Sequence, residues 1–409
     1  MDNCPTVVLA TPAWSLNGPN VFSANLAREL NARQIPSHIV VTRPDWVDAK
    51  PLPPPPDVPM RTLPVRPCMS LRARWSAMVR YLEECAPCIY VPNYDFGHSC
   101  VSPRLSDRVA IVGIVHSDDP QHYEHVARLG RYWNAVVAVS SAIADQVRKI
   151  APSVSPRLST IPYGVTSAGA LPSRSRALRQ PLRVIYAGRL DHSQKRVLDL
   201  PDILKVSLEL GVPVHLTIAG RGPAEGQLRS RCSALGVEGH AEFLGTLDRE
   251  ALAKVLAQQD VFLLASDFEG LPLGVLEAMG QGCVPIVKDI RSGIGDVVTD
   301  GLNGYLVAPD DLTGFAARLA DLYHDPEMRG RMAAAAYNTV RSGCYRLDSM
   351  VESYVELFGR VLADTRCGTF RRPPGPIDPP PGLPWQEHLP EPIQRAGHYG
   401  RRLLAMARG

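Results

Sequence analysis

The chain has 409 residues, with 44 lysines and arginines against 41 aspartates and glutamates, and nine cysteines. This length allows two or three domains, and the near balance of charge gives no reason to expect a nucleic-acid partner. The cysteines are odd in number and scattered, which indicates reduced thiols and a cytoplasmic location. The start of the chain lacks the basic region of a signal peptide, and no apolar run approaches the roughly 20 residues of a membrane span. We therefore expect a soluble protein that touches a membrane peripherally at most.

The first part of the chain alternates apolar runs of strand length with helical patterns. The expected strands are residues 6–10, 38–42, 89–91, 109–115 and 135–139. Between the first two, residues 21–31 repeat apolar side chains at helical spacing, and such a βαβ unit implies a parallel sheet. Residues 71–82 form an amphipathic helix with arginines on one face; packing on the sheet is favoured over contact with anionic lipid.

Two residues of this part stand at the carboxyl ends of strands, where open α/β sheets bind ligands. Gly18 lies in the loop after the first strand and lets a ligand approach the backbone, with an ordinary turn as the alternative. His116 directly follows the strand 109–115. Asp119 is expected to cap a helix that starts at Pro120. His116 has no such structural explanation, so we favour a functional histidine over a satisfied core histidine.

Residues 166–180 are rich in serine, alanine, proline and arginine and lack apolar periodicity, which indicates a linker. A second α/β pattern follows it. Its expected strands are residues 182–188, 214–220, 241–245, 260–266 and 283–287. We therefore predict two doubly wound Rossmann-like domains in tandem, residues 1–165 and 181–345, with a cleft between the ends of their strands.

The segment 267–282 combines a loop, a helix start and two carboxylates. Pro272 is expected in the first helical turn, and the free amides and positive dipole end of such a helix favour phosphate. Glu269 lies in the loop and Glu277 about one turn into the helix. Carboxylates so close to an anion site suit the hydroxyls of a ribose or a sugar. The alternative, two solvated glutamates with Glu277 complementing the dipole, fits the local pattern equally well.

Arg189 and Lys195 lie six residues apart in the loop after the first strand of the second domain. Two cations at the carboxyl end of a strand can close around a diphosphate, whereas a basic loop in water would be the default elsewhere. Residues 220–226 are glycine-rich but lack the spacing and the acidic strand end of a dinucleotide fingerprint. A nicotinamide site is therefore not expected.

Together these motifs resemble the retaining GT-B glycosyltransferases of family 4, also called glycosyl transferases group 1, over nearly all of residues 5–362. Glu269 and Glu277, with seven residues between them, are similar to the glutamate signature of that family. Arg189 and Lys195 keep the interval of its diphosphate clamp. The Gly18 loop and the histidine at position 116 fall where the family has its glycine loop and its sugar-contacting histidine.

The resemblance implies a role for each of these residues. Arg189 and Lys195 would hold the donor diphosphate and stabilise the departing nucleotide, and Glu277 would hydrogen-bond the ribose. Glu269 would face the transferred sugar, while His116 would contact that sugar from the other domain when the cleft closes. Backbone amides of the glutamate loop and the helix start would bind sugar hydroxyls and phosphate; these are Gly270, Leu271 and Leu273.

The resemblance further implies a UDP- or GDP-sugar donor and a glycan, lipid-linked or small-molecule acceptor. Retention by front-face attack without a metal is expected, and the sequence has no Asp-x-Asp motif or His/Cys cluster suited to a nucleotide-bound cation. A GT-B epimerase or phosphorylase is the alternative enzyme, although no lysine is a convincing anchor for pyridoxal phosphate. A non-catalytic glycan-binding subunit is the third reading, but it would have lost the set Arg189, Lys195 and Glu277.

Two departures from the family pattern stand out. Asp296 follows Gly295 where many members have glutamate, a change expected to alter little. The segment 271–273 replaces the commoner aromatic residue and glycine, so we expect it to influence which sugar is accepted. By resemblance, a helix over 346–362 crosses back onto the first domain. Residues 363–409, proline-rich with a basic end, lie outside the family pattern and are expected to form an extended tail on the first domain. A membrane-touching or partner-binding end is the alternative, and the oligomeric state is open.

Overall fold

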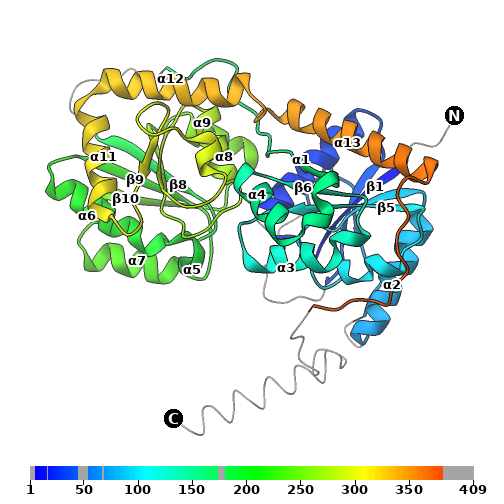
Figure 1. Ribbon diagram of the computed structural model, residues 1–409. Helices are drawn as coiled ribbons and strands as arrows, with labels where there is room; N and C mark the ends of the chain where they lie inside the picture. Colours follow the sequence, from blue (N-terminus) through cyan, green and yellow to red (C-terminus); the bar gives the residue numbers. More distant parts are fainter. Residues whose placement is uncertain (1–4, 16, 45–53, 67–68, 174–179, 381–409) are drawn as a thin grey trace, which may run out of the picture.

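The computed structural model describes residues 5–15, 17–44, 54–66, 69–173 and 180–380, which form two domains, each built on one parallel sheet (Figure 1). In the described part of the chain, the N-terminal sheet has the strand order β3-β2-β1-β4-β5-β6-β7. Its strands are β1 (Thr6–Thr11), β2 (Ser37–Val41), β3 (Met60–Thr62), β4 (Cys88–Val91), β5 (Val109–Val115), β6 (Ala135–Ala138) and β7 (Leu158–Thr160). The order reverses at β1, so this is a doubly wound sheet whose ligand crevice lies beside that strand.

The C-terminal sheet has the strand order β10-β9-β8-β11-β12-β13. Its strands are β8 (Leu182–Ala187), β9 (Val214–Ala219), β10 (Ala241–Gly245), β11 (Val261–Leu264), β12 (Val284–Lys288) and β13 (Tyr305–Val307). Here the order reverses between β8 and β11, which pair in parallel. The predicted architecture of two tandem Rossmann-like domains is confirmed.

Helices cover both sheets. Those of the N-terminal domain are α1 (Gly18–Ala32), α2 (Leu71–Cys85), α3 (Pro120–Leu129) and α4 (Ser141–Ile150). Those that follow are α5 (His192–Lys195), α6 (Leu200–Glu209), α7 (Glu225–Ala234), α8 (Arg249–Leu256), α9 (Leu273–Gly280), α10 (Ile294–Val297), α11 (Leu312–His324), α12 (Pro326–Ser342) and α13 (Leu347–Cys367). Among the described residues, no helix has both the length and the apolarity needed to span a bilayer.

The local signals of the sequence explain where several elements begin. Asp119 accepts a hydrogen bond from the amide of Gln121 and caps α3, with Pro120 as the first helical residue, as predicted. Asn17 caps α1, so this helix starts at Gly18, earlier than its apolar repeat indicates. Pro272 was expected inside the first turn of α9, but that prediction is wrong by one place. Its ψ of 110° is extended, so Pro272 is the N-cap and the helix begins one residue later.

The helix α13 joins the end of the second domain to the first domain. It starts beside Val165, which forms a backbone bridge with Arg346. Tyr354 on α13 packs against Phe22 of α1, with 5.4 Å between ring centroids. In Figure 1 the helix runs along the α1 side of the N-terminal sheet, opposite α3 and α4. The orange end of the described chain then follows the surface of the first domain.

That final described segment is held by specific contacts. The amide of Asp378 donates to the carbonyl of Cys100 over 3.0 Å. The buried guanidinium of Arg372 donates to four backbone carbonyls and to the side-chain oxygen of Asn134. The first part of the predicted tail therefore lies on the N-terminal domain. The basic end and the residues 381–409 as a whole lie outside the described part of the chain.

Candidate functional site

A cavity of about 720 Å³ lies between the two domains, beside β1 and between the ends of β8 and β11. It contains every residue for which the sequence predicts a role. The predicted residues that line it are Gly18, His116, Arg189, Lys195, Glu269, Gly270, Leu271, Leu273 and Glu277. The structure therefore brings together positions that are up to 259 residues apart (277 − 18). Whether each residue performs its predicted role depends on the local contacts.

The pairing of β8 with β11 places the two predicted motifs side by side. Parallel neighbours end at the same edge of the sheet, so the loop after β8 and the loop after β11 leave it together. Gln194 joins the loops, because its side chain donates to the carbonyl of Phe268 over 3.1 Å and accepts from Arg189 over 3.1 Å. Gln194 was not predicted as a site residue, because it is an ordinary polar residue until its neighbour across the sheet is known.

Lys195 and Glu269 form an ion pair that the sequence did not predict. The lysine Nζ lies 2.6 Å from the glutamate Oε1, and only 5% of Glu269 is exposed. A carboxylate this buried requires a partner, and Lys195 is that partner. The diphosphate clamp and the glutamate loop are thus one charged unit.

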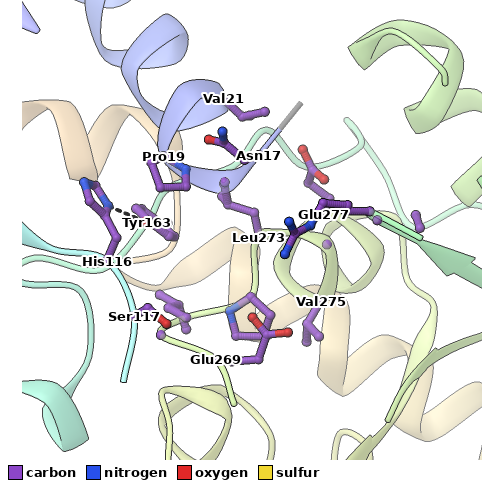
Figure 2. Close-up of a pocket in the computed structure, with 18 of the residues that line it drawn as sticks. Asn17, Pro19, Val21, His116, Ser117, Tyr163, Glu269, Leu273, Val275 and Glu277 are labelled. Atoms are coloured by element: carbon purple, nitrogen blue, oxygen red, sulfur yellow. Dashed lines mark hydrogen bonds between the residues drawn. The ribbon is translucent and has the colours of Figure 1, made fainter. Parts of the chain in front are cut away.

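The N-terminus of α9 faces the same cavity. In the described structure, the amides of Leu273 and Gly274 make no hydrogen bond, since the helical bonds begin with the amide of Val275 donating to Pro272. Open amides at the positive end of a helix dipole favour an anion. Leu273 also lies against the other domain, because a Cβ added at Gly18 would meet its Cδ1 at 3.7 Å. Figure 2 shows Leu273 beside Asn17 and Pro19, so the first turns of α1 and α9 meet at the cavity.

Gly270 and Leu271 make contacts that the sequence did not predict, while ligand binding by their amides stays a prediction. Gly270 forms an isolated antiparallel bridge with Ser117 of the N-terminal domain, and an added Cβ there would lie 2.0 Å from the carbonyl oxygen of His116. Leu271 is 3% exposed and packs beside Gly293. Gly270 therefore joins the two domains, and glycine is required where their backbones meet.

Glu277 lines the cavity, and its side-chain carboxyl has no hydrogen-bond partner among the described residues. Burial raises the pKa of its carboxyl to about 7, and the positive charge of Arg249 lowers it only in part. Ionising this carboxyl group in the cavity therefore costs desolvation free energy. Ligand hydroxyls can offset that cost by donating hydrogen bonds to the carboxylate. Figure 2 shows Glu277 and Glu269 at separate places on the cavity wall.

His116 has a structural explanation that the sequence did not reveal. The hydroxyl of Tyr163 lies 2.6 Å from its Nδ1, and the side-chain oxygen of Asn93 lies 3.0 Å from its Nε2. The Asn93 amide donates to the carbonyl of Ala10 and to the hydroxyl of Ser23, so its oxygen must accept, and the imidazole proton lies on Nε2. Burial holds the pKa of His116 well below its ordinary value. The expectation that His116 has no structural role is wrong, while its contact with a sugar stays a prediction.

The two domains also meet outside the cavity. The carboxylate of Asp296 accepts from the amide of Ser141 over 2.8 Å and from its hydroxyl, at the N-terminus of α4. Arg291 donates to Asp118 over 2.8 Å. Asp296, the departure from the family pattern that was expected to alter little, thus supplies a contact between the domains. In the described part of the chain, no group of three or more histidine, cysteine, aspartate or glutamate side chains is arranged to hold a metal ion.

Comparison with known proteins agrees with this architecture. The family model described as Glycosyltransferase Family 4 matches residues 16–168, and the model described as Glycosyl transferases group 1 matches residues 172–339. Glycogen synthase of Mycobacterium tuberculosis is 28% identical over 214 residues, which cover 52% of this chain and 51% of that protein. The match thus spans about half the length of this curated relative.

Solved structures share the fold over most of the chain. Sucrose-phosphate synthase from Thermosynechococcus elongatus is 18% identical with a TM-score of 0.72, covering 88% of this chain and 99% of that one. HepE of Anabaena in complex with UDP and glucose is 15% identical with a TM-score of 0.71, covering 87% and 99%. The two family models follow one another along the two domains whose cleft holds the predicted residues. The chain therefore belongs to the GT-B glycosyltransferases of family 4, the glycosyl transferases group 1.

Proposed function

We propose that the protein transfers a sugar from a UDP- or GDP-sugar to the hydroxyl of a glycan, lipid-linked or small-molecule acceptor, with retention and without a metal. The observation that carries this proposal is the composition of one wall of the cavity. Arg189, Lys195, the N-terminus of α9 and Glu277 all lie on the C-terminal domain and face the same space. Such a wall matches the successive parts of a nucleotide sugar.

The phosphates would bind where positive charge is concentrated. Arg189 and Lys195 supply two cations, and the amides of Leu273 and Gly274 supply open donors at a helix N-terminus. Glu277 would accept hydrogen bonds from both ribose hydroxyls, a task for which the ionised form is suited. UDP is the nucleotide in the complex of HepE, which supports testing it first.

In the proposed reaction, the bond between the anomeric carbon and the phosphate oxygen breaks as the acceptor oxygen bonds to the same face of that carbon. The acceptor proton passes to the departing phosphate oxygen, so the products are a glycoside and a nucleoside diphosphate. Negative charge grows on the leaving group during this step. Lys195, Arg189 and the dipole of α9 would stabilise that charge, which is the largest contribution in reactions of this kind.

The ion pair between Lys195 and Glu269 gives the lysine two duties. Its ammonium group neutralises a carboxylate that is 5% exposed. With a donor bound, the same ammonium group would lie between Glu269 and the diphosphate, while Glu269 would accept hydrogen bonds from the transferred sugar. This arrangement keeps the charges of the site balanced before and after the nucleotide leaves.

The first experiment is a screen of UDP- and GDP-sugars for thermal stabilisation, followed by donor consumption with and without candidate acceptors. The proposal expects stabilisation by one nucleotide, acceptor-dependent release of that nucleotide in the presence of EDTA, and a product with the anomeric configuration of the donor. Conversion of the donor into an epimer without an acceptor would contradict transferase activity. Lys195→Met should lower turnover at least about 100-fold. The matched control is Lys205→Met on α6, whose lysine pairs with Glu209 at the surface.

A cytoplasmic location, with peripheral membrane contact left open, remains part of this proposal. Cell fractionation tests it, because the protein should separate with the cytoplasm or be released from membranes by salt.

A further inference from the structure

The wall of the cavity that belongs to the N-terminal domain carries a histidine with no assigned role. His122 lies in the first turn of α3 and lines the cavity. Its ring stands between two others: the centroid of Phe96 is 4.9 Å away in an edge-to-face arrangement, and that of His116 is 6.4 Å away. The inference that follows rests on the proposed function, because it concerns the acceptor.

His122 differs from the neighbouring histidines in its hydrogen bonds. His98 contacts Asp95 over 3.2 Å, His125 contacts Ser99 over 3.1 Å, and both ring nitrogens of His116 have partners. The ring of His122 makes no hydrogen bond within the part of the chain that the structure describes. A partly buried imidazole with both nitrogens unused, facing a cavity, is placed to bind a ligand.

The charge around His122 indicates what kind of ligand this is. Among the described residues that line the cavity, Arg28 is the one arginine or lysine of the N-terminal domain, and it is paired with Asp57. The other cations of the cavity, Arg189, Lys195 and Arg249, belong to the C-terminal domain. The wall around His122 therefore offers no spare positive charge to a carboxylate or a phosphate. An uncharged ligand fits this wall, since a desolvated anion would be left without a counter-charge.

The shape and chemistry of the wall favour a sugar. Phe96, Trp14 and Tyr94 line it with aromatic rings, which can cover the apolar face of a pyranose. A neutral imidazole presents one N–H donor and one acceptor nitrogen, which together suit a pair of neighbouring hydroxyls. Burial lowers the pKa of His122 to about 4, so the ring is neutral at physiological pH.

We propose that His122 is the acceptor-binding histidine of the N-terminal domain, and that the acceptor group it holds is an uncharged pyranose. In this arrangement the ring of His122 lies beside that of His116, which Tyr163 and Asn93 hold in place. His122 binds hydroxyls of the acceptor and takes no part in donor binding.

The test measures sugar binding separately from nucleotide binding. Methyl α-D-glucopyranoside, methyl β-D-galactopyranoside and methyl α-D-mannopyranoside are added in turn to the UDP- or GDP-saturated protein, and binding is followed by saturation-transfer NMR. L-Malate and glycerol 3-phosphate serve as anionic probes of similar size. At least one pyranoside should bind to the wild type, and neither anion should compete with it.

Two substitutions then test the histidine itself. His122→Phe keeps the ring and removes its hydrogen bonds, so pyranoside affinity should fall about tenfold or more. His122→Gln keeps a donor and an acceptor and should retain most of the affinity. The control is His240→Phe, at the exposed end of a short 3-10 helix in the other domain. The thermal shift produced by the nucleotide should be the same in all four proteins.

The inference is overturned if no pyranoside binds, if malate or glycerol 3-phosphate binds in its place, or if His122→Phe binds the pyranoside as the wild type does. Failure of the proposed function would look different. In that case neither UDP nor GDP would stabilise the wild-type protein.

Discussion

Replacement of Lys195 by methionine separates the two duties of this residue. Methionine keeps the aliphatic stem but removes the charge, so the substitution leaves Glu269 buried without a partner. Removing one member of a fully buried ion pair costs about 3–5 kcal/mol, whereas an exposed pair contributes about 0–1 kcal/mol. The side chains of Lys195 and Glu269 are 19% and 7% exposed, which lies between these cases. We therefore expect the free energy of unfolding to fall by about 2 kcal/mol.

A second substitution distinguishes lost pairing from lost catalysis. In the double variant Lys195→Met/Glu269→Gln no unpaired charge is buried, so much of the lost stability should return. Donor turnover should fall at least about 100-fold in the single variant, because the leaving diphosphate loses a cation, and should not return in the double variant. Stability is measured by urea unfolding and turnover by nucleotide release, with Lys205→Met as the surface control.

Two results would refute this reasoning. Wild-type turnover in Lys195→Met would show that the lysine does not stabilise the leaving group. Equal loss of stability in the single and double variants would show that the pairing with Glu269 is not what Lys195 contributes to the fold.

Ionised Glu277 should bind the ribose best, so affinity for UDP-glucose should rise as the pH passes through about 7. The diphosphate of UDP-glucose does not titrate near neutrality, so Glu277→Gln should remove this pH dependence. A pH profile of Glu277→Gln equal to that of the wild type would contradict the prediction. In the ligand-free protein the sign is opposite: because the folded pKa of Glu277 lies above its unfolded value, its contribution to stability is present at low pH and lost as the pH rises through about 7. Gly270→Ala places a Cβ 2.0 Å from the carbonyl oxygen of His116, so it should separate the domains and reduce turnover about tenfold or more. The control is Gly226→Ala, where a Cβ meets nothing within 4 Å, and it should show wild-type turnover. Arg372→Met leaves buried carbonyls without their donor, so stability should fall by about 3 kcal/mol and limited proteolysis should cut the C-terminal segment; resistance equal to wild type would argue against this anchor.

The strands that the sequence predicted well are the buried central ones. The limits of β5 were predicted without error, because a parallel strand covered on both faces is a continuous apolar run. The strands β3, β7 and β13 were missed. Each has only three residues at or near a sheet edge, which is too short to show a period of two.

In the candidate site, too, local features were predictable from the sequence and contacts between distant residues were not. By itself the sequence identified nine of the residues that line the cavity, because strand ends and helix starts are local features and parallel strands end at a common edge. It missed others, such as Gln194 and His122. It could not determine which side chains are partners. Lys195 reaches Glu269 across 74 positions, and His116 reaches Tyr163 across 47, through contacts that exist only after the loops and domains have packed. The tertiary structure therefore decided that His116 is already satisfied and that His122 is not, since hydrogen-bond partners depend on distances in space and leave no period in the sequence.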